Sequence, residues 1–183
     1  MSIRQKIAGT VLKMCGWTVS KNVDFPEKCV ICIAPHTSNW DFFFGCLGYS
    51  ALGGTGKQFM IKKEWFFFPL NLFFKAIGGI PINRGKKTST TDQMVEACNS
   101  SDHFHLGITP EATRKANKDW KMGFYYIAKK ADIPIAVVSL DYKKKEGKIL
   151  SLYIPTDNPE QDIANIKAMY QGVTACYPDQ FVI

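Results

Sequence analysis

The sequence predicts an α/β fold: a single domain with a largely parallel, mixed sheet flanked by helices. Short apolar runs of strand length alternate along the chain with stretches of helical periodicity. No internal repeat or linker interrupts this alternation, so we expect one domain over residues 1–183. The 183 residues, 46% of them hydrophobic, suffice for one well-packed core and are too few for two.

The first expected element is an amphipathic helix within residues 1–20. Four apolar side chains recur there at helical spacing: Ile3, Ile7, Val11 and Met14. Such a stripe either docks on the domain or lies on a membrane surface. We expect it to dock, because that is the commoner use of an amphipathic helix in a globular protein.

Strands and helices then alternate to the end of the chain. Strands are expected over residues 29–34, 59–61, 79–82, 104–108, 133–140 and 149–154. Helices are expected over residues 41–52, in an aromatic region that ends near residue 77, and over residues 90–98, 121–131 and 158–176. Thr90 with Gln93 suits a capping box at the start of one helix. Asn158 followed by Pro159 suits the start of the last helix.

The composition narrows the functional classes. The formal net charge of +7 favours an anionic partner: a phosphate-bearing substrate, nucleic acid or acidic lipid. Arg4, Lys6 and Lys13 interrupt the apolar character of the N-terminus, which therefore differs from a secretory signal. The most apolar stretch, residues 65–74, is shorter than the roughly 20 residues of a membrane-spanning helix. We therefore expect a soluble or peripheral protein.

The six cysteines are spaced irregularly, unlike the framework of a secreted disulfide protein. Cys29 and Cys32 form a C-x-x-C pair inside an apolar strand. A three-residue spacing in a strand directs two side chains to opposite faces. We therefore expect two buried structural thiols and a reduced, cytoplasmic compartment.

The first chemical motif is His36-Thr37-Ser38-Asn39-Trp40-Asp41, which lies between an expected strand and an expected helix. In α/β folds, ligands bind at that edge of the sheet. Asp41 can accept a hydrogen bond from His36 Nδ1–H and leave Nε2 free as a general base for a hydroxyl group. The same spacing also fits an aspartate that only caps the helix.

Three further motifs follow in the chain. Residues 79–85 read as a strand that ends in an arginine, Arg84, which suits either a bidentate phosphate contact or an ordinary surface arginine. Residues 109–115 place Glu111 and Arg114 in one tight loop, which suits a polar substrate with hydroxyl and phosphate groups. Residues 133–138 form an apolar strand, and a place in the core is enough to explain it.

Together, and in this order, the four motifs resemble the phospholipid and glycerol acyltransferase family that includes 1-acylglycerol-3-phosphate acyltransferase. That family has an H-x4-D motif, a strand ending near an arginine, a P-E-G-T-R loop and a P-I-V-P-V-like strand; the resemblance spans residues 31–138. It implies a glycerol-phosphate acyltransferase-like fold with His36 as the base and Asp41 as its partner. It implies further that the substrate is bound by Arg84, Glu111, Thr113 and Arg114.

The implied reaction moves a fatty acyl group from an acyl thioester to the hydroxyl of a lysophospholipid such as 1-acylglycerol-3-phosphate. The donor is acyl-CoA or acyl carrier protein, and no metal, further cofactor or nucleophilic side chain is needed. We expect backbone N–H groups of residues 37–40 to hold the developing oxyanion. Two residues depart from the family pattern. Ala112 replaces a glycine and fits only with a negative φ, and Asn83 replaces a common aspartate.

Two alternatives stay open: an O-acyltransferase acting on a lyso-amino-lipid without phosphate, and a non-catalytic domain that binds membrane surfaces. Residues 57–87 carry seven Lys or Arg side chains against the single acid Glu64. The contiguous aromatics of residues 65–68 fit a membrane better than RNA, whose binding uses singly spaced aromatics. We therefore expect an anionic membrane surface as partner, no nucleic acid, and a peripheral location at the inner face of the membrane.

Overall fold

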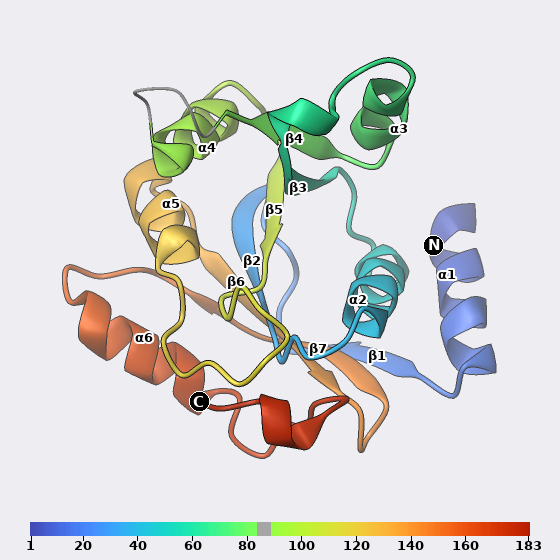
Figure 1. The fold of residues 1–183 in the computed structure, drawn as a ribbon. Coiled ribbons are helices and arrows are strands. Elements are labelled where there is room, and N and C mark those ends of the chain that lie inside the picture. Colours follow the sequence, from blue (N-terminus) through green and yellow to red (C-terminus); the bar gives the residue numbers. More distant parts are fainter. Residues whose placement is uncertain (84–88) are drawn as a thin grey trace.

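The chain folds around one twisted sheet, as Figure 1 shows. The computed structural model describes residues 1–83 and 89–183. Within them, seven strands pair in the order β1-β7-β6-β2-β5-β3-β4. Their bounds are β1 Thr18–Lys21, β2 Lys28–Ala34, β3 Lys57–Lys62, β4 Gly79–Ile82, β5 Phe104–Ile108, β6 Ile135–Asp141 and β7 Glu146–Tyr153. Strands β6, β2, β5, β3 and β4 are mutually parallel, and β7 pairs with β6 in the antiparallel direction. The expected α/β fold with a largely parallel sheet is confirmed.

Helices cover both faces of this sheet (Figure 1). Their bounds are α1 Ile3–Met14, α2 Trp40–Ala51, α3 Leu70–Ala76, α4 Thr90–Asn99, α5 Gly123–Ala131 and α6 Pro159–Ala168. Single 3₁₀ turns are formed by Lys63–Trp65 and Pro178–Gln180. Helices α4, α5 and α6 lie on one side of the sheet, and α1 and α2 lie on the other. No described helix is long and apolar enough to cross a membrane.

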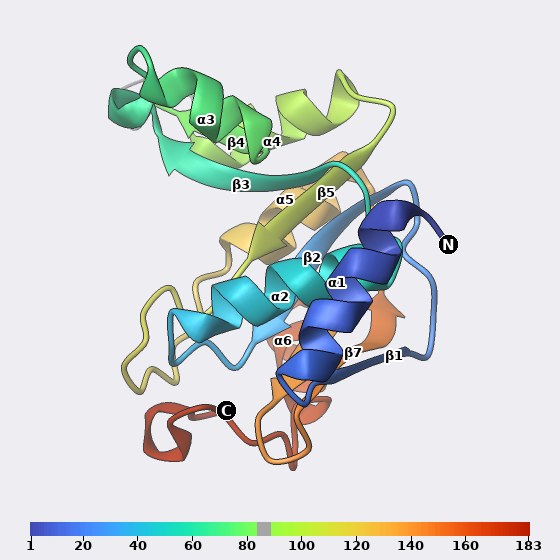
Figure 2. The same cartoon turned by 90° about the vertical axis from the view of Figure 1, so that its right-hand side faces the viewer.

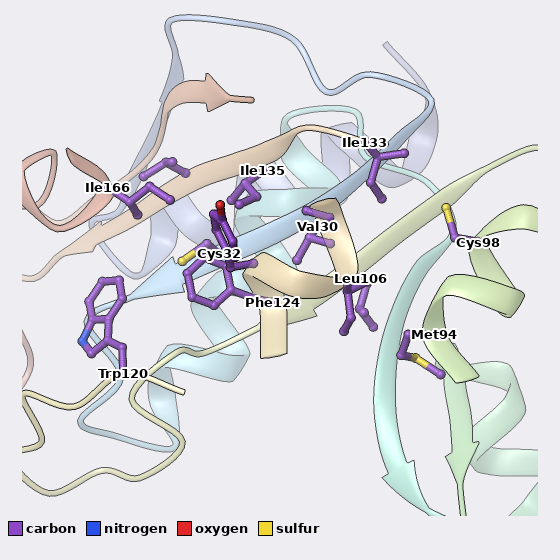
Figure 3. Close-up of a cluster of buried hydrophobic side chains, with 14 of the residues drawn as sticks. Val30, Cys32, Met94, Cys98, Leu106, Trp120, Phe124, Ile133, Ile135 and Ile166 are labelled. Carbon is purple, nitrogen blue, oxygen red and sulfur yellow. The ribbon is translucent and has the colours of Figure 1, made fainter. Parts of the chain in front are cut away.

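The core separates into layers on the two faces of the sheet. In Figure 3, Val30 and Cys32 of β2 lie beside Phe124 of α5 and Ile166 of α6 in the larger layer. Cys29 belongs to a smaller cluster on the opposite face, as the strand alternation predicts. Burial raises the pKa of the Cys29 thiol to about 12. The thiol is therefore protonated at neutral pH and acts as a small packing group.

Several element boundaries differ from the expected ones. Strand β1 was not predicted, because its four residues are only partly buried and pair with β7 alone. Helix α4 is capped by Ser89, whose hydroxyl accepts from Asp92 N–H, so the predicted Thr90 cap is wrong by one residue. Helix α6 ends at Ala168 instead of near residue 176. The chain then turns through Gly172 with φ of 78°, a conformation that a continuing helix does not have.

The orientation expected for the N-terminal helix is also wrong. Helix α1 packs against α2, but the residues it buries are Ala8 and Leu12. The predicted stripe faces solvent, with exposed fractions of 78% for Ile3, 59% for Ile7 and 83% for Met14. The face of α1 that contacts α2 is thus the one with Ala8 and Leu12, and three of the four stripe residues lie on the outer surface.

Candidate active site

Three neighbouring strand ends meet at one edge of the sheet. Strand β2 is followed by His36, and it lies between β5 and β6 in the sheet. Strand β5 is followed by the loop that contains Glu111, and β6 is followed directly by Tyr142. Because the three strands are parallel, their carboxyl ends bring these side chains together.

His36 and Asp41 form the central pair of this edge. His36 Nδ1 lies 3.2 Å from Asp41 Oδ2. An ionised carboxylate can only accept, so the imidazole donates from Nδ1, and in the neutral ring the lone pair then lies on Nε2. The His36 side chain is 21% exposed and that of Asp41 only 3%. The buried Asp41 thus holds the His36 ring at Nδ1, while the rest of the ring remains accessible to a substrate.

Four donors surround the Asp41 carboxylate. Oδ2 accepts from His36 and from the N–H groups of Thr37 at 2.7 Å and Ser38 at 2.8 Å, and Oδ1 accepts from the Tyr142 hydroxyl at 2.5 Å. Burial raises the pKa of this carboxyl, but the four hydrogen bonds outweigh burial and hold the pKa below its usual value. Asp41 is therefore ionised at neutral pH. It binds amides that precede α2, so helix capping is not its role.

These same contacts contradict the expected oxyanion site. The N–H groups of Thr37 and Ser38 are committed to Asp41, and that of Trp40 lies 3.2 Å from the Ser38 hydroxyl oxygen. Three of the four amides of residues 37–40 thus have intramolecular partners. The loop uses them to fix the aspartate rather than to present them to a substrate.

Glu111 lies on the other side of His36. Its side chain is buried, at 3% exposure, and its Oε1 accepts from the His36 backbone N–H at 2.9 Å. Burial raises the pKa of this carboxyl, against the opposing effect of its backbone hydrogen bonds. The Glu111 carboxylate thus binds the backbone of the loop that contains His36.

Two of the remaining predicted residues, Thr113 and Arg114, lie in the loop that follows Glu111. Arg114 is exposed, and its Nη1 donates to Asn39 Oδ1 at 2.7 Å, which brings the guanidinium beside the His36 loop. Thr113 is partly exposed, and its hydroxyl accepts from Lys115 N–H at 3.2 Å. Arg84 lies outside the described residues.

Ala112 contradicts the expectation of a negative φ. Its φ is 54°, in the left-handed region, where a glycine would be free of the clash between Cβ and the backbone. The residue lies directly after Glu111 and lines the cavity described next. The loop therefore keeps the backbone conformation of a glycine while carrying an alanine.

An apolar cavity of about 450 Å³ begins at the His–Asp pair. It runs between α2 and the sheet, and α2 lines it from Asp41 to Leu52, a distance of roughly 16 Å at 1.5 Å per residue. Its apolar walls come from α2 and from four strands: Phe42, Gly45, Cys46, Gly48, Tyr49, Ile31, Ile33, Phe59, Met60, Ile108, Val138 and Leu140. The His36–Asp41 pair thus adjoins a long apolar space.

Sequence reasoning missed both this cavity and Tyr142. The cavity depends on how α2 lies over the sheet, which local periodicity does not describe. Tyr142 follows the strand that was interpreted as core alone, two residues beyond its expected end. The polar residues Asp141 and Tyr142 directly after an apolar run could have indicated a further strand end at the site.

His105 makes structural contacts behind Tyr49, a residue that lines the cavity. Its Nδ1 lies 2.6 Å from the Tyr49 hydroxyl, and its Nε2 lies 2.6 Å from the Pro26 carbonyl oxygen. Burial lowers the pKa of His105, against the opposing hydrogen bond to Pro26. Both ring nitrogens thus have protein partners.

Comparison with known proteins agrees with this architecture. A family model described as Acyltransferase matches residues 16–141. The crystal structure of the 1-acyl-sn-glycerophosphate (LPA) acyltransferase, PlsC, from Thermotoga maritima superposes with a TM-score of 0.60 at 17% sequence identity, and the match covers 92% of this chain and 74% of that chain. The likeness at this identity concerns the fold. No curated protein sequence matches the chain.

Proposed function

The chain belongs to the acyltransferase family and is an acyltransferase enzyme, and from this we propose that it transfers a fatty acyl group from an acyl thioester to the hydroxyl of a lysophospholipid such as 1-acylglycerol-3-phosphate. The donor is acyl-CoA or acyl carrier protein. The observation that carries the proposal is the apolar cavity that begins at the His36–Asp41 pair. Family membership removes the non-catalytic membrane domain as an alternative.

We derive the mechanism from the pair. His36 Nε2 takes the proton of the acceptor hydroxyl, and that oxygen attacks the thioester carbonyl carbon. The tetrahedral intermediate then collapses, the C–S bond breaks, and the imidazolium returns the proton to the leaving thiolate. Asp41 stabilises the transient positive charge on the ring, because it is ionised and lies 3.2 Å from Nδ1. General-base help of this kind is worth about 10²–10⁴-fold in rate.

The cavity supports a long acyl chain as the transferred group. Its walls are aliphatic and aromatic, and a hydrocarbon chain placed there leaves water on binding. With the chain lying along α2, the thioester carbonyl falls at the end where His36 stands. The space thus explains why a base for acyl transfer lies at the mouth of an apolar cavity.

The basic residues near the entrance support a phosphorylated acceptor. Arg114 is exposed and lies beside Asn39, where its guanidinium can form two parallel hydrogen bonds to a phosphate. We propose Arg84 and Thr113 as further contacts to the acceptor. We propose that Glu111 fixes the loop that contains His36, through its hydrogen bond with the His36 N–H. Positive charge here suits the lysophospholipid more than an amino-lipid acceptor.

Exposed apolar side chains support a membrane surface as the place of reaction. Helices α1, α2 and α3 face the viewer together in Figure 2. Their exposed side chains and those beside α3 include Ile3, Ile7, Trp40, Phe42, Trp65, Phe67, Phe68, Leu72 and Phe73. Lys62 and Lys63 precede the aromatic group and favour an anionic lipid surface. We propose a peripheral, cytoplasmic enzyme at the inner face of the membrane.

Lipid mass spectrometry tests the proposal. The purified protein is incubated with phosphorylated and amino-lipid lyso-acceptors, each with acyl-CoA and with acyl-loaded carrier protein. Diacyl product from a phosphorylated acceptor with either donor is expected. Product from the amino-lipid acceptors alone would replace the proposed substrate, and no acylated lipid from any pair would contradict the proposal.

A further inference from the structure

The two oxygens of Asp41 have unequal partners. Oδ2 accepts three hydrogen bonds, from His36 Nδ1 and from the amides of Thr37 and Ser38. In the described part of the chain, the donor recorded for Oδ1 is the hydroxyl of Tyr142 at 2.5 Å. The carboxylate is 3% exposed, so solvent does not readily supply a replacement for that donor.

Tyr142 is itself held firmly from several directions. Its ring lies edge-on to Trp17, with centroids 4.9 Å apart, and Trp17 stacks on Phe44 of α2 at 4.3 Å. Its backbone N–H donates to the Thr174 carbonyl at 2.8 Å. The segment that contains Thr174 also reaches the base loop, because the N–H of Tyr177 lies 3.1 Å from Thr37 Oγ1. The phenol is thus anchored by α2, the α1–β1 connection and the C-terminal segment.

The protonation state fixes the direction of the hydrogen bond. Burial raises the pKa of the Tyr142 phenol above its ordinary value, and the hydrogen bond to Asp41 and the charge of that carboxylate raise it further. The phenol keeps its proton at working pH, and it donates to Oδ1 while Asp41 is ionised.

We infer that Tyr142 is a positioning residue of the acyl-transfer site. By binding Oδ1, its hydroxyl sets the rotation of the Asp41 carboxylate so that Oδ2 faces His36 Nδ1. It follows the last residue matched by the family model and comes directly after β6, the strand that pairs with β2, which precedes His36. The inference rests on the proposed general-base role of His36. Tyr142 is then the third residue of a hydrogen-bonded chain that runs from Tyr142 through Asp41 to His36.

The Tyr142→Phe variant removes the hydroxyl and keeps the ring with its packing on Trp17. We expect kcat to fall about tenfold or more, as for loss of an orienting hydrogen bond to a catalytic dyad, while the KM values for donor and acceptor stay close to wild type. The matched control is Tyr125→Phe. Tyr125 is also buried and donates to a carboxylate, that of Asp162 at 2.9 Å, but it lies on α5 on the opposite face of the sheet. Its variant should keep the wild-type kcat.

A second comparison separates positioning from a general loss of structure. In the His36→Ala background there is no base to orient, so adding Tyr142→Phe should leave the residual rate unchanged. A merely structural role of the hydroxyl would lower the rate by the same factor in both backgrounds, and that result would overturn the inference. A wild-type kcat for Tyr142→Phe would overturn it as well. Full activity of the His36→Ala variant alone would instead contradict the proposed mechanism.

Discussion

At the scale of single residues, Ala112 carries a measurable strain. A non-glycine residue with φ of 54° costs about 1–2 kcal/mol. Glycine removes that cost but loses more chain entropy on folding, by roughly 0.5–1 kcal/mol. We therefore expect Ala112→Gly to raise the free energy of unfolding by up to about 1.5 kcal/mol, measured by urea denaturation.

Ala116 provides the matched control for that change. It is an exposed alanine of the same loop and has no positive φ. Ala116→Gly should leave stability unchanged or reduce it, because only the entropy cost applies there. If Ala112→Gly is no more stable than Ala116→Gly, the backbone at residue 112 is unstrained.

The motif residues of the site were predictable from the sequence, whereas several of their contacts were not. His36, Asp41, Glu111 and Arg114 belong to ordered motifs, and the structure brings all four to one sheet edge. The use of the loop amides by Asp41 was not predictable, because it depends on the turn between β2 and α2. The buried position of Glu111 follows from strand order, which periodicity alone does not supply.

At the scale of elements, the glycines of α2 keep the cavity open. Gly45 lines it, and an added Cβ would meet only Leu140 Cδ1, at 4.0 Å. A leucine at residue 45 should therefore fit on the helix and fill part of the space. We expect Gly45→Leu to lower kcat/KM for long-chain donors about tenfold relative to short-chain donors. The added side chain takes the place of the far methylenes of a long acyl chain, which then lose their contacts with the cavity walls.

Gly9 serves as the control for that substitution. It is also a helical glycine, on α1, and no atom lies within 4 Å of its ideal Cβ position. Gly9→Leu should leave chain-length preference as in the wild type. An unchanged preference in Gly45→Leu, measured with donors of graded length, would show that the acyl chain lies elsewhere.

The segment from the 3₁₀ turn Lys63–Trp65 to α3 is the proposed membrane contact. Trp65, Phe67 and Phe68 are exposed, with Lys62 and Lys63 beside them. Each lysine near an anionic surface adds about 1 kcal/mol of binding. We expect the protein to co-sediment with anionic liposomes at low salt, and the double variant Lys62→Glu with Lys63→Glu to bind much less.

The same charge change on another element controls for net charge. Lys143→Glu with Lys144→Glu alters the exposed turn between β6 and β7, far from α3 in Figure 1. That variant should bind more strongly than the Lys62 and Lys63 variant. Equal losses in the two variants, or wild-type protein that ignores the liposomes, would contradict a dock at α3.

The prediction of helices and strands succeeded where one buried face or one continuous apolar run determines the spacing of the apolar residues. The predicted strands from β2 to β7 are present, because each is a short apolar run bounded by turn residues. Periodicity misplaced the buried face of α1, because apolar side chains occur on more than one face of the helix and α1 packs on α2 through Ala8 and Leu12 rather than through Ile3, Ile7 and Met14.

At the scale of the whole molecule, sheet order assembles the site. Motifs separated by up to about a hundred residues meet because β5, β2 and β6 are neighbours with parallel directions. The order of motifs predicted the fold and the acyltransferase family. The cavity and the Tyr142 contact arise from the packing of α2 and the C-terminal segment around that edge, which no single motif describes.

The most direct test of the account is the initial rate of acyl transfer by His36→Ala. The variant is compared with wild type and with His103→Ala, a histidine remote from the cavity mouth, and folding is checked by circular dichroism and thermal unfolding. We predict a rate at least about 10²-fold below wild type for His36→Ala with an unchanged fold, and a normal rate for His103→Ala. A folded His36→Ala protein that retains most of the wild-type rate would contradict the general-base mechanism.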